Sequence, residues 1–306
     1  MRRWRPKFAF GPWFGLLLLL LTLAGVWYLG QRLVLALSGT PQEWPITLNL
    51  YANFVALLAL LLLLAALAYR LVAVFTLTYE IDRNGVYISW SGHRAIVPLN
   101  QIEHLDIGTP GARIPWRLIQ GIGGYWGQGR TANGQPLHLF ATRPPRKCLL
   151  LQTSDAVYAI SPAAQEAFVQ DLEQRRKLGV VKPLAAKVET SRLLAYAFWN
   201  DRIARRALVL AFSLNLLMLG ILAARYPNLA VALPLQFDVT GQPIDLRPRH
   251  HVLLLPLAAF LISVCNVVVG IILYQHERIG VQLLQLASVL TQVLFGVVII
   301  AIVLRF

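Results

Sequence analysis

Five long apolar runs constrain this chain more than any other feature of its sequence. An α-helix needs about 20 apolar residues to cross the hydrocarbon core of a bilayer. Runs of about that length or longer occupy residues 13–37, 48–76, 207–224, 252–273 and 281–304. The composition, with 57% hydrophobic and 14% charged residues, agrees with a membrane protein rather than a soluble enzyme. We therefore predict five membrane-spanning helices.

The first apolar run follows four cations, Arg2, Arg3, Arg5 and Lys7, and so resembles the start of a secretory signal. Its leucine-rich core is too long for a cleaved signal, however, and it lacks a small-residue cleavage pattern. We interpret residues 13–37 as a retained anchor.

The positions of Lys and Arg predict how the chain crosses the membrane, because cytoplasmic flanks are enriched in these residues. The basic N-terminus is predicted to be cytoplasmic, and residues 38–46, which contain no Lys or Arg, are predicted to be external. Residues 77–206 are then cytoplasmic. The cations that agree with this topology are Arg202, Arg205, Arg206 and Arg278, and those that disagree are Arg32, Arg225, Arg247, Arg249 and Arg305. The expected location is the inner (cytoplasmic) membrane of a bacterium.

The net charge of +14 is concentrated on the predicted cytoplasmic side. Residues 77–206 contain 17 Lys or Arg against 10 Asp or Glu, and the N-terminal tail adds four more cations. A cation beside the membrane gains about 1 kcal/mol against anionic lipid. Membrane lipids therefore account for the charge, and we expect no nucleic acid partner because no aromatic and basic recognition motif accompanies it.

The segment after residue 76 changes to short alternating runs separated by turn residues, which is typical of β-strands. We predict strands at residues 77–81, 86–90, 94–99, 100–108, 137–142, 148–153 and 156–160. A helix is predicted over residues 163–178, with Ser161 as its N-cap, Pro162 in its first turn, and Phe168 and Leu172 on its buried face. Together these elements predict a small antiparallel sheet closed by one helix.

The stretch GYWGQGRT, residues 124–131, has the glycine spacing of a phosphate-binding loop. A loop of that kind must open a helix. Here residues 132–136 read ANGQP, a turn signal, and the alternating strand 137–140 follows. We predict a bent strand or loop in which glycines prevent side-chain clashes.

Four stretches of the cytoplasmic segment resemble the pleckstrin-homology-like (PH-like) domains of bacterial membrane proteins. They are YEIDRNGVYI (79–88), IPWRLIQGIGGYWG (114–127), LHLFAT (137–142) and VYAISPAAQEAFVQDL (157–172). The resemblance implies a partly open seven-stranded barrel capped by a C-terminal helix, and a domain that binds or scaffolds rather than catalyses. A phosphoinositide-type pocket would need clustered cations on the first hairpin, which offers Arg83 and then Arg94 with His93.

Aromatic and basic residues suggest where a lipid surface or a partner would bind. The first group is Arg113, Trp116, Arg117, Tyr125, Trp126 and Arg130, which suits a headgroup surface. Core packing of the same aromatic residues is the alternative. The second group is Arg202, Arg205 and Arg206 in residues 191–206, which form either a helix on the inner surface or an extension of the third span.

The external loop, residues 233–250, is similar to the loop of an uncharacterised bacterial membrane family that includes toxin-immunity and signalling proteins. The matching positions are Pro234, Phe237, Asp238, Gly241 and Pro243, whereas the acidic and Trp-Gly positions of that family are represented here by Asp245 alone. The alternative interpretation is a compact turn tied by Gly241 and Pro243.

Residues suited to chemistry are scattered along the sequence. Cys148 and Cys265 show no CxxC spacing, so we expect neither a disulfide nor a zinc site. His250 and His251 are adjacent and therefore point in different directions. We expect no catalytic residue, no metal site and no cofactor. A polar stripe on the fifth span, Gln282, Gln285, Ser288 and Gln292, is expected to face other helices and hold them together rather than form a translocation path.

The sequence thus predicts four regions: a two-helix membrane hairpin (1–76), a PH-like cytoplasmic domain (77–180), a linker with an interfacial helix (181–206) and a three-helix membrane domain (207–306). The expected function is non-enzymatic binding of a protein partner or lipid headgroups, as a scaffold or accessory subunit of a membrane complex. The alternative is a small sensor, a toxin-immunity protein or a transporter that acts through the last three spans. Loss of function from changes at Arg113, Arg117 or Arg130 would favour the first, and from changes at Asp238, Asp245 or Gln285 the second.

Overall fold

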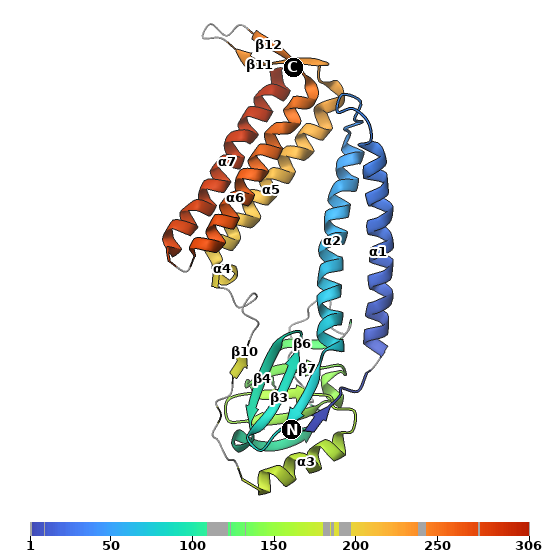
Figure 1. Cartoon of the computed structure of the whole chain (residues 1–306), viewed down its shortest axis with the longest axis vertical. Coiled ribbons are helices and arrows are strands. Elements are labelled where there is room, and N and C mark those ends of the chain that lie inside the picture. The colour runs from blue at the N-terminus through green and yellow to red at the C-terminus, as the bar shows by residue number, and fades with distance from the viewer. Residues whose placement is uncertain are drawn as a thin grey trace. The chain divides into compact units, whose positions relative to one another are not determined.

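The computed structural model describes the chain except residues 1, 9, 109–121, 123, 132, 180–183, 185–186, 190–196, 238–242, 275 and 306. Its helices are α1 (Phe10–Ala36), α2 (Leu48–Phe75), α3 (Gln165–Lys177), α4 (Ala197–Asn200), α5 (Arg202–Arg225), α6 (Leu254–Leu273) and α7 (Arg278–Arg305) (Figure 1). The chain divides into two compact units, residues 1–25 with 60–191 and residues 26–59 with 192–306. The long helices α1 and α2 contribute to both units, which are described separately below.

The five predicted spans are present as helices. The segments long and apolar enough to cross a membrane are Phe10–Ala36, Leu48–Phe75, Arg202–Asn228, Arg249–Leu273 and Arg278–Arg305. The chain therefore has the architecture of a multi-pass membrane protein with a β-rich domain inserted between its second and third spans.

The third span begins earlier than its apolar run because basic residues form its first turns. Asp201 interrupts the helical segment after α4, and its side chain accepts hydrogen bonds from the amides of Ile203 and Ala204 at the start of α5. Arg202, Arg205 and Arg206 therefore lie on α5 itself. The candidate third span, Arg202–Asn228, includes these arginines, and residues 191–196 of the expected surface helix lie outside the described residues.

The β-rich domain contains two five-stranded sheets that are not closed into a barrel. The first has the order β1-β2-β3-β4-β10 and the second the order β5-β8-β9-β7-β6. The strands predicted from alternation are confirmed as β2 (Thr78–Ile81), β3 (Gly85–Trp90), β4 (His93–Pro98), β5 (Ile102–Ile107), β7 (Pro136–Ala141), β8 (Leu149–Thr153) and β9 (Val157–Ile160). The expected bent strand around GYWGQGRT is β6 (Tyr125–Arg130).

Three features of these sheets differ from the sequence prediction. β9 lies between β7 and β8 and pairs with β7 in parallel, so the second sheet is not purely antiparallel. Two short strands from outside the predicted domain, β1 (Arg2–Trp4) and β10 (Lys187–Glu189), extend the first sheet at its two edges. Both are three residues long, which is too short to give an alternating pattern.

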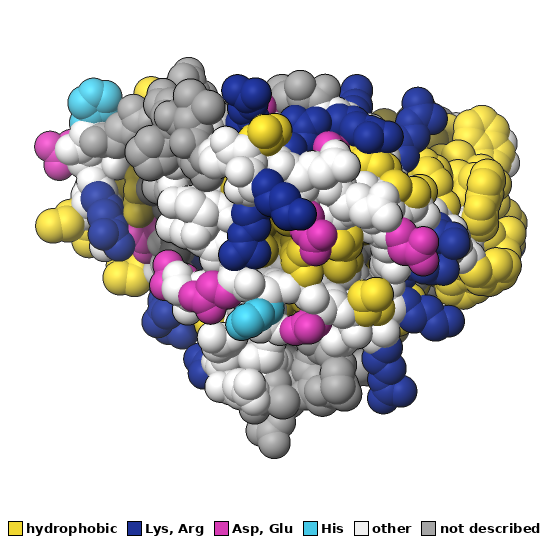
Figure 2. Space-filling view, turned by 90° about the horizontal axis from the view of Figure 1, so that it is seen from below, with side chains coloured by type: hydrophobic (Ala, Val, Ile, Leu, Met, Phe, Trp, Pro, Cys, Tyr) yellow, Lys and Arg dark blue, Asp and Glu magenta, His cyan; other side chains and the backbone are white. Residues whose placement is uncertain are grey.

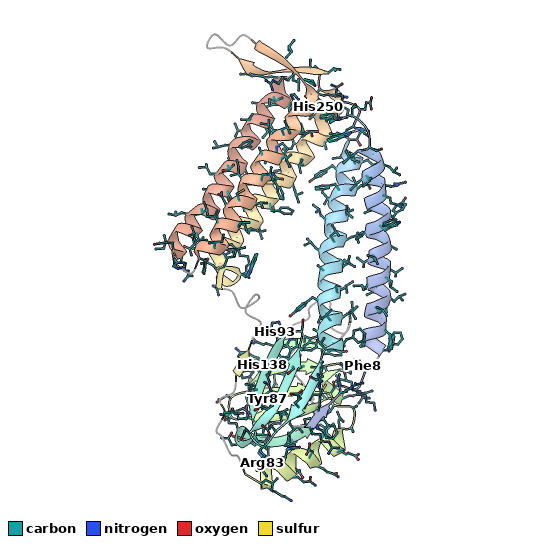
Figure 3. The ribbon with its side chains drawn as sticks, in the orientation of Figure 1. Phe8, Arg83, Tyr87, His93, His138 and His250 are labelled. Carbon is teal, nitrogen blue, oxygen red and sulfur yellow. The ribbon has the colours of Figure 1, made fainter. Side chains whose placement is uncertain are left out.

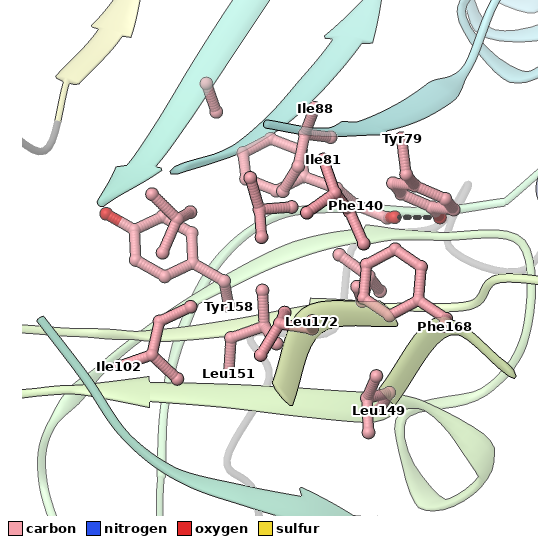
Figure 4. Close-up of a cluster of buried hydrophobic side chains, with 14 of the residues drawn as sticks. Tyr79, Ile81, Ile88, Ile102, Phe140, Leu149, Leu151, Tyr158, Phe168 and Leu172 are labelled. Atoms are coloured by element: carbon pink, nitrogen blue, oxygen red, sulfur yellow. Dashed lines mark hydrogen bonds between the residues drawn. The ribbon is translucent and has the colours of Figure 1, made fainter. Parts of the chain in front are cut away.

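One hydrophobic core fills the space between the sheets and α3 (Figure 4). Its residues include Tyr79, Ile81, Ile88, Ile102, Phe140, Leu149, Leu151, Tyr158, Phe168 and Leu172. Phe168 and Leu172 lie on the buried face of α3, as the sequence predicted. The predicted N-cap is wrong, because α3 begins at Gln165 after Ala164 and the Ser161 hydroxyl instead accepts a hydrogen bond from the Thr142 amide, at 2.9 Å.

In the second unit, α7 packs along both α5 and α6 through its polar stripe. Gln285, Ser288 and Gln292 are each at most 1% exposed. The Gln292 amide donates to the Ala259 carbonyl and the Ser263 hydroxyl, and it accepts from Asn215. The stripe therefore faces neighbouring helices, as predicted.

The loop before α6 forms a hairpin of β11 (Ala232–Phe237) and β12 (Pro243–Pro248). Leu233 is buried with Leu222 and Tyr226 at the end of α5. The compact turn predicted at Gly241 falls in residues 238–242, outside the described residues. In the same unit α2 packs against α5, where the Tyr51 hydroxyl donates to the Leu216 carbonyl at 2.9 Å.

Candidate functional site

Two short connections join the β-rich domain to the ends of α1 and α2. α2 ends at Phe75, and β2 begins at Thr78. The ring of Phe8, two residues before α1 begins, lies 5.9 Å from the ring of Phe75. Because both connections are only a few residues long, the same end of the domain must always face the helix ends.

This end of the domain, which we call the membrane-proximal rim, comprises the turn between β3 and β4 and the first residues of β6. The Ser91 amide donates to the Thr76 hydroxyl at 2.8 Å, just beyond the end of α2. The Tyr69 hydroxyl lies 3.4 Å from Nε2 of His93. A Cβ atom at Gly124 would lie 3.0 Å from Cγ2 of Val74 and 3.1 Å from the Ala141 carbonyl, so a glycine is needed there. The expectation that glycines of this stretch prevent clashes holds at Gly124.

Aromatic side chains from both sheets gather at the rim. The ring of Trp90 lies 4.6 Å from Phe140, 5.5 Å from His93 and 5.8 Å from Trp126. Burial lowers the pKa of His93. Trp126 is partly buried and packs against the edge of the core, which leaves it amphipathic and suited to an interface.

The structure separates the binding residues predicted from sequence. Tyr125 and Trp126 lie at the rim, but Arg130 ends β6 about 17 Å farther along that strand. Arg202, Arg205 and Arg206 are exposed on α5 in the other unit. Arg113, Trp116 and Arg117 lie outside the described residues.

The N-terminal segment, residues 2–8, forms a strap across the domain that sequence analysis did not predict. β1 pairs with β2, and Trp4 is buried against the ring of Phe168 at 5.7 Å. Farther along, the Lys7 amide donates to the Ser161 carbonyl at 2.8 Å, and the Lys7 carbonyl accepts from the Thr142 hydroxyl at 2.7 Å. The strap is therefore held by backbone pairing at both ends, and its cations project from an ordered segment.

A buried hydroxyl network supports the strap from inside the domain. The Tyr79 hydroxyl donates to the Phe140 carbonyl at 2.7 Å and accepts from the Ser161 amide at 3.1 Å. The hydroxyls of Ser161 and Thr142 lie 2.9 Å apart. Burial raises the pKa of Tyr79 far above its ordinary value, so this hydroxyl remains a donor.

A cavity of about 670 Å³ lies between the strap, the end of β5 and the first two turns of α3. Its polar lining residues are Lys7, Arg143, Gln165, Glu166 and Gln170, and its apolar ones are Ile107, Leu149, Ala163, Ala164, Ala167 and Val169. No ion pair to Lys7 or Arg143 is present among the described residues. The cavity therefore has a mainly apolar lining, in which Lys7 and Arg143 outnumber the one carboxylate, Glu166.

The first hairpin of the domain, β2 and β3, does not contribute to the lining of this cavity. The loop between β2 and β3, residues 82–84, which we call the distal loop, lies beside α3, whereas His93 and Phe8 lie near the ends of α2 and α1 (Figure 3). The six residues of β3 separate the distal loop from the rim by about 20 Å. Arg83 therefore projects away from the helix ends. Arg94, the other cation considered there, covers the ring of Tyr87 at 4.1 Å.

A second polar cluster, also missed from sequence, ties together one end of the helical bundle. The buried Asp201 carboxylate accepts hydrogen bonds from Tyr274 at 2.8 Å, Gln282 at 2.8 Å and Arg278 at 3.0 Å. Burial raises the pKa of Asp201, but the hydrogen bonds from Gln282, Tyr274, the Ala204 amide and Arg278 outweigh it and hold the pKa well below its ordinary value. The signal in the sequence was an Asp directly before an apolar helix, which is typical of an N-cap.

A third feature is a pocket of about 260 Å³ between α5 and α6, with α7 as its floor. Its lining is mainly apolar, and its polar residues are Asn215, Ser263, Gln285, Ser288 and Gln292. The side-chain carbonyl of Gln285 is buried there without a hydrogen-bond partner among the described residues.

Titratable groups form no reactive arrangement in the part of the chain that the structure describes. No group of three His, Cys, Asp or Glu side chains that could hold a metal ion is found there. Burial raises the pKa of the Cys148 thiol to about 12, and the thiol donates to the Arg143 carbonyl. The other cysteine, Cys265, is exposed on α6.

Comparison with known proteins bears on the β-rich domain. Residues 77–176 match a family model described as a bacterial PH domain. The match extends from the residue before β2 almost to the end of α3, and it confirms the resemblance drawn from residues 79–88, 114–127, 137–142 and 157–172. No curated protein and no solved structure matches the chain. The chain is thus a membrane protein with a PH-like domain, whose strap, β10 and membrane helices lie outside the matched segment.

Proposed function

We propose that this chain is a non-enzymatic membrane protein whose PH-like domain binds a protein partner through the surface that faces away from its own membrane helices. It would act as a scaffold or accessory subunit of a complex in the bacterial inner membrane, with the domain in the cytoplasm. The observation that carries the proposal is the double attachment of the domain to α1 and α2.

Attachment to both helices matters because it restricts the orientation of the domain relative to the ends of α1 and α2. Through Phe8 and Thr76 the rim stays at the helix ends, and the strap adds β1 to the sheet. The distal loop and the C-terminal half of α3 consequently point into the aqueous phase. A surface held at a constant distance from the membrane suits a partner that also sits there.

The chemistry of the outward surface favours a protein over a lipid layer. Viewed from the side of α3, Lys and Arg side chains are interspersed with Asp and Glu (Figure 2). Charges of both signs provide complementarity to another protein, whereas a headgroup layer attracts a uniformly basic surface. The distal loop carries both Asp82 and Arg83, and α3 carries Glu173 beside Arg176.

The proposed orientation rests on cations near the helix ends. Arg2, Arg3, Arg5 and Lys7 are exposed on the strap before α1. Pairing of β1 with β2 requires the N-terminus and the PH-like domain to share one side of the membrane. By the positive-inside rule that side is the cytoplasm.

The test is brief crosslinking of the full chain in its native membrane, followed by purification in mild detergent. A stoichiometric protein partner linked through residues 77–190 supports the proposal. A matched comparison uses Arg83→Glu with Arg176→Glu on the outward surface, which should reduce the crosslinked partner several-fold. Recovery of the chain with no protein bound would contradict the proposal.

The pocket between α5 and α6 favours a second candidate, a sensor, immunity protein or transporter acting through the last three spans. The lining of this pocket is almost entirely apolar, which suits a small apolar molecule. Under this candidate Gln285→Leu abolishes function, whereas the two outward-surface changes leave it intact.

A further inference from the structure

We infer that the cavity beside the strap is a binding site for the headgroup of an anionic phospholipid. The site lies at the entry of α1 rather than on the outward surface, so it stands independently of the proposed protein partner. Three observations carry it: the charge of its lining, its fixed geometry and its distance from the bilayer.

The lining matches a phosphodiester with hydroxyl groups attached. Lys7 and Arg143 offer two cations, and Gln165 and Gln170 offer amides for hydroxyl groups. Glu166, the one carboxylate in the lining, is exposed at the cavity mouth and leaves the excess positive. Arg146 and Lys147 lie on the adjoining turn, whose Lys147 carbonyl accepts a hydrogen bond from Gln165. Basic side chains of this kind bind phosphate as point charges or through paired hydrogen bonds.

The geometry of the site is set before any ligand arrives. Backbone hydrogen bonds on both sides of Lys7 join it to Ser161 and Thr142. Arg143 follows Thr142 directly, and its carbonyl accepts from the buried Cys148 thiol. The two cations therefore leave an ordered backbone, which reduces the conformational entropy lost on binding.

The distance to the membrane identifies the source of the ligand. Lys7 precedes the first residue of α1 by three positions, which span at most about 10 Å. Between them Phe8 contacts Phe75, the last residue of α2, so both spans end beside this segment. The headgroup layer on one side of a bilayer is several ångströms thick. Lys7 is consequently within reach of headgroups, and Ile107, which is 72% exposed, lines the same cavity.

The test is native mass spectrometry of the full-length chain in mild detergent, titrated with phosphatidylglycerol or phosphatidylcholine. The variant is Lys7→Gln with Arg143→Gln. The matched control, Lys177→Gln with Arg83→Gln, removes the same charges at exposed positions away from the cavity. Each cation beside the membrane should contribute about fivefold, so the variant should bind phosphatidylglycerol about 30-fold more weakly than the native chain. The control should retain native affinity, and phosphatidylcholine binding should be weak throughout.

Equal phosphatidylglycerol binding by the variant, the control and the native chain would overturn the inference. A second experiment adds inorganic phosphate to the lipid-bound chain. If phosphate displaces the lipid at a concentration equal to that of the lipid, the site binds a free anion, and the assignment to a lipid headgroup is overturned. If the double variant fails to fold, Lys7→Gln alone should weaken binding about fivefold. Failure to find a protein partner in the crosslinking experiment would not change any of these lipid-binding results. The proposed function and the lipid site can therefore be contradicted independently.

Discussion

At the scale of single residues, the Tyr79 hydroxyl connects elements that no local pattern links. It bridges the ends of β7 and β9, and through Ser161 and Thr142 it supports the strap. The sequence placed Tyr79 in the predicted strand 77–81. It could not indicate the partners of the hydroxyl, because these lie 61 and 82 residues away.

We predict that Tyr79→Phe destabilises the PH-like domain. The change leaves the Ser161 amide and the Phe140 carbonyl buried without this partner, at a cost of about 1–3 kcal/mol. The measurement is the unfolding midpoint of the full chain in detergent. Tyr87→Phe is the control, since it also removes a hydroxyl and keeps the ring beneath Arg94. Equal midpoints for both variants would show that the network contributes little.

The histidines of the domain predict a dependence on pH. Burial lowers the pKa of His93 and of His138 in the folded chain, whereas an unfolded chain has the ordinary value near 6.5. As pH falls through that value the unfolded state binds more protons, so stability present above about pH 6.5 is lost on acidification.

The unfolding temperature of the full chain should therefore fall between pH 7.5 and pH 5. In the variant His93→Gln with His138→Gln this difference should shrink, while in His104→Gln, which changes an exposed residue of β5, it should remain. If the unfolding temperature of the double variant falls between pH 7.5 and pH 5 by as much as that of the native chain, the pH dependence comes from other groups.

At the scale of elements, sequence patterns predicted what depends on length or periodicity. The five spans follow from apolar runs and the strands β2 to β5 and β7 to β9 from alternation. β1 and β10 could not be predicted, because a three-residue strand has no pattern and its pairing depends on the tertiary fold. The N-cap assigned to Ser161 was wrong for a related reason: the core network engages its hydroxyl.

For the candidate sites too, the sequence predicted the residue types but not their tertiary arrangement. Aromatic and basic residues near β6 could be named from composition, but the structure places Tyr125 and Arg130 at opposite ends of that strand. Lys7 was predicted as one of four N-terminal cations that orient the chain and face anionic lipid, not as part of a site in the PH-like domain. Its place beside Arg143 depends on the strap, which exists because β1 pairs with a strand more than 70 residues away.

Asp201 supports a prediction about the start of α5. Asp201→Ala removes the N-cap and leaves Tyr274 and Gln282 without their shared acceptor, so the bundle should lose about 3 kcal/mol. The measurement is resistance of the C-terminal bundle to proteolysis and heat in detergent. Asp155→Ala, in the turn between β8 and β9, is the control. Unchanged resistance in Asp201→Ala would contradict the assigned role.

At the scale of the whole molecule, the PH-like domain is attached to two of the membrane helices, α1 and α2. A domain tethered by one flexible linker would present every face in turn. Here the strap contacts the end of α2 through Phe8 and Phe75, and the rim contacts it through Ser91 and Thr76. We propose a lipid headgroup for the membrane side of this domain and a protein for its outward side.

The measurement that tests this account most directly is site-specific photocrosslinking in native membranes, with the photoreactive residue placed either at Arg83 or at Lys7. We expect position 83 to yield one discrete protein adduct and position 7 to yield lipid adducts. A protein adduct at position 7 with none at position 83 would contradict the central claim, because it would place the partner on the membrane side of the domain.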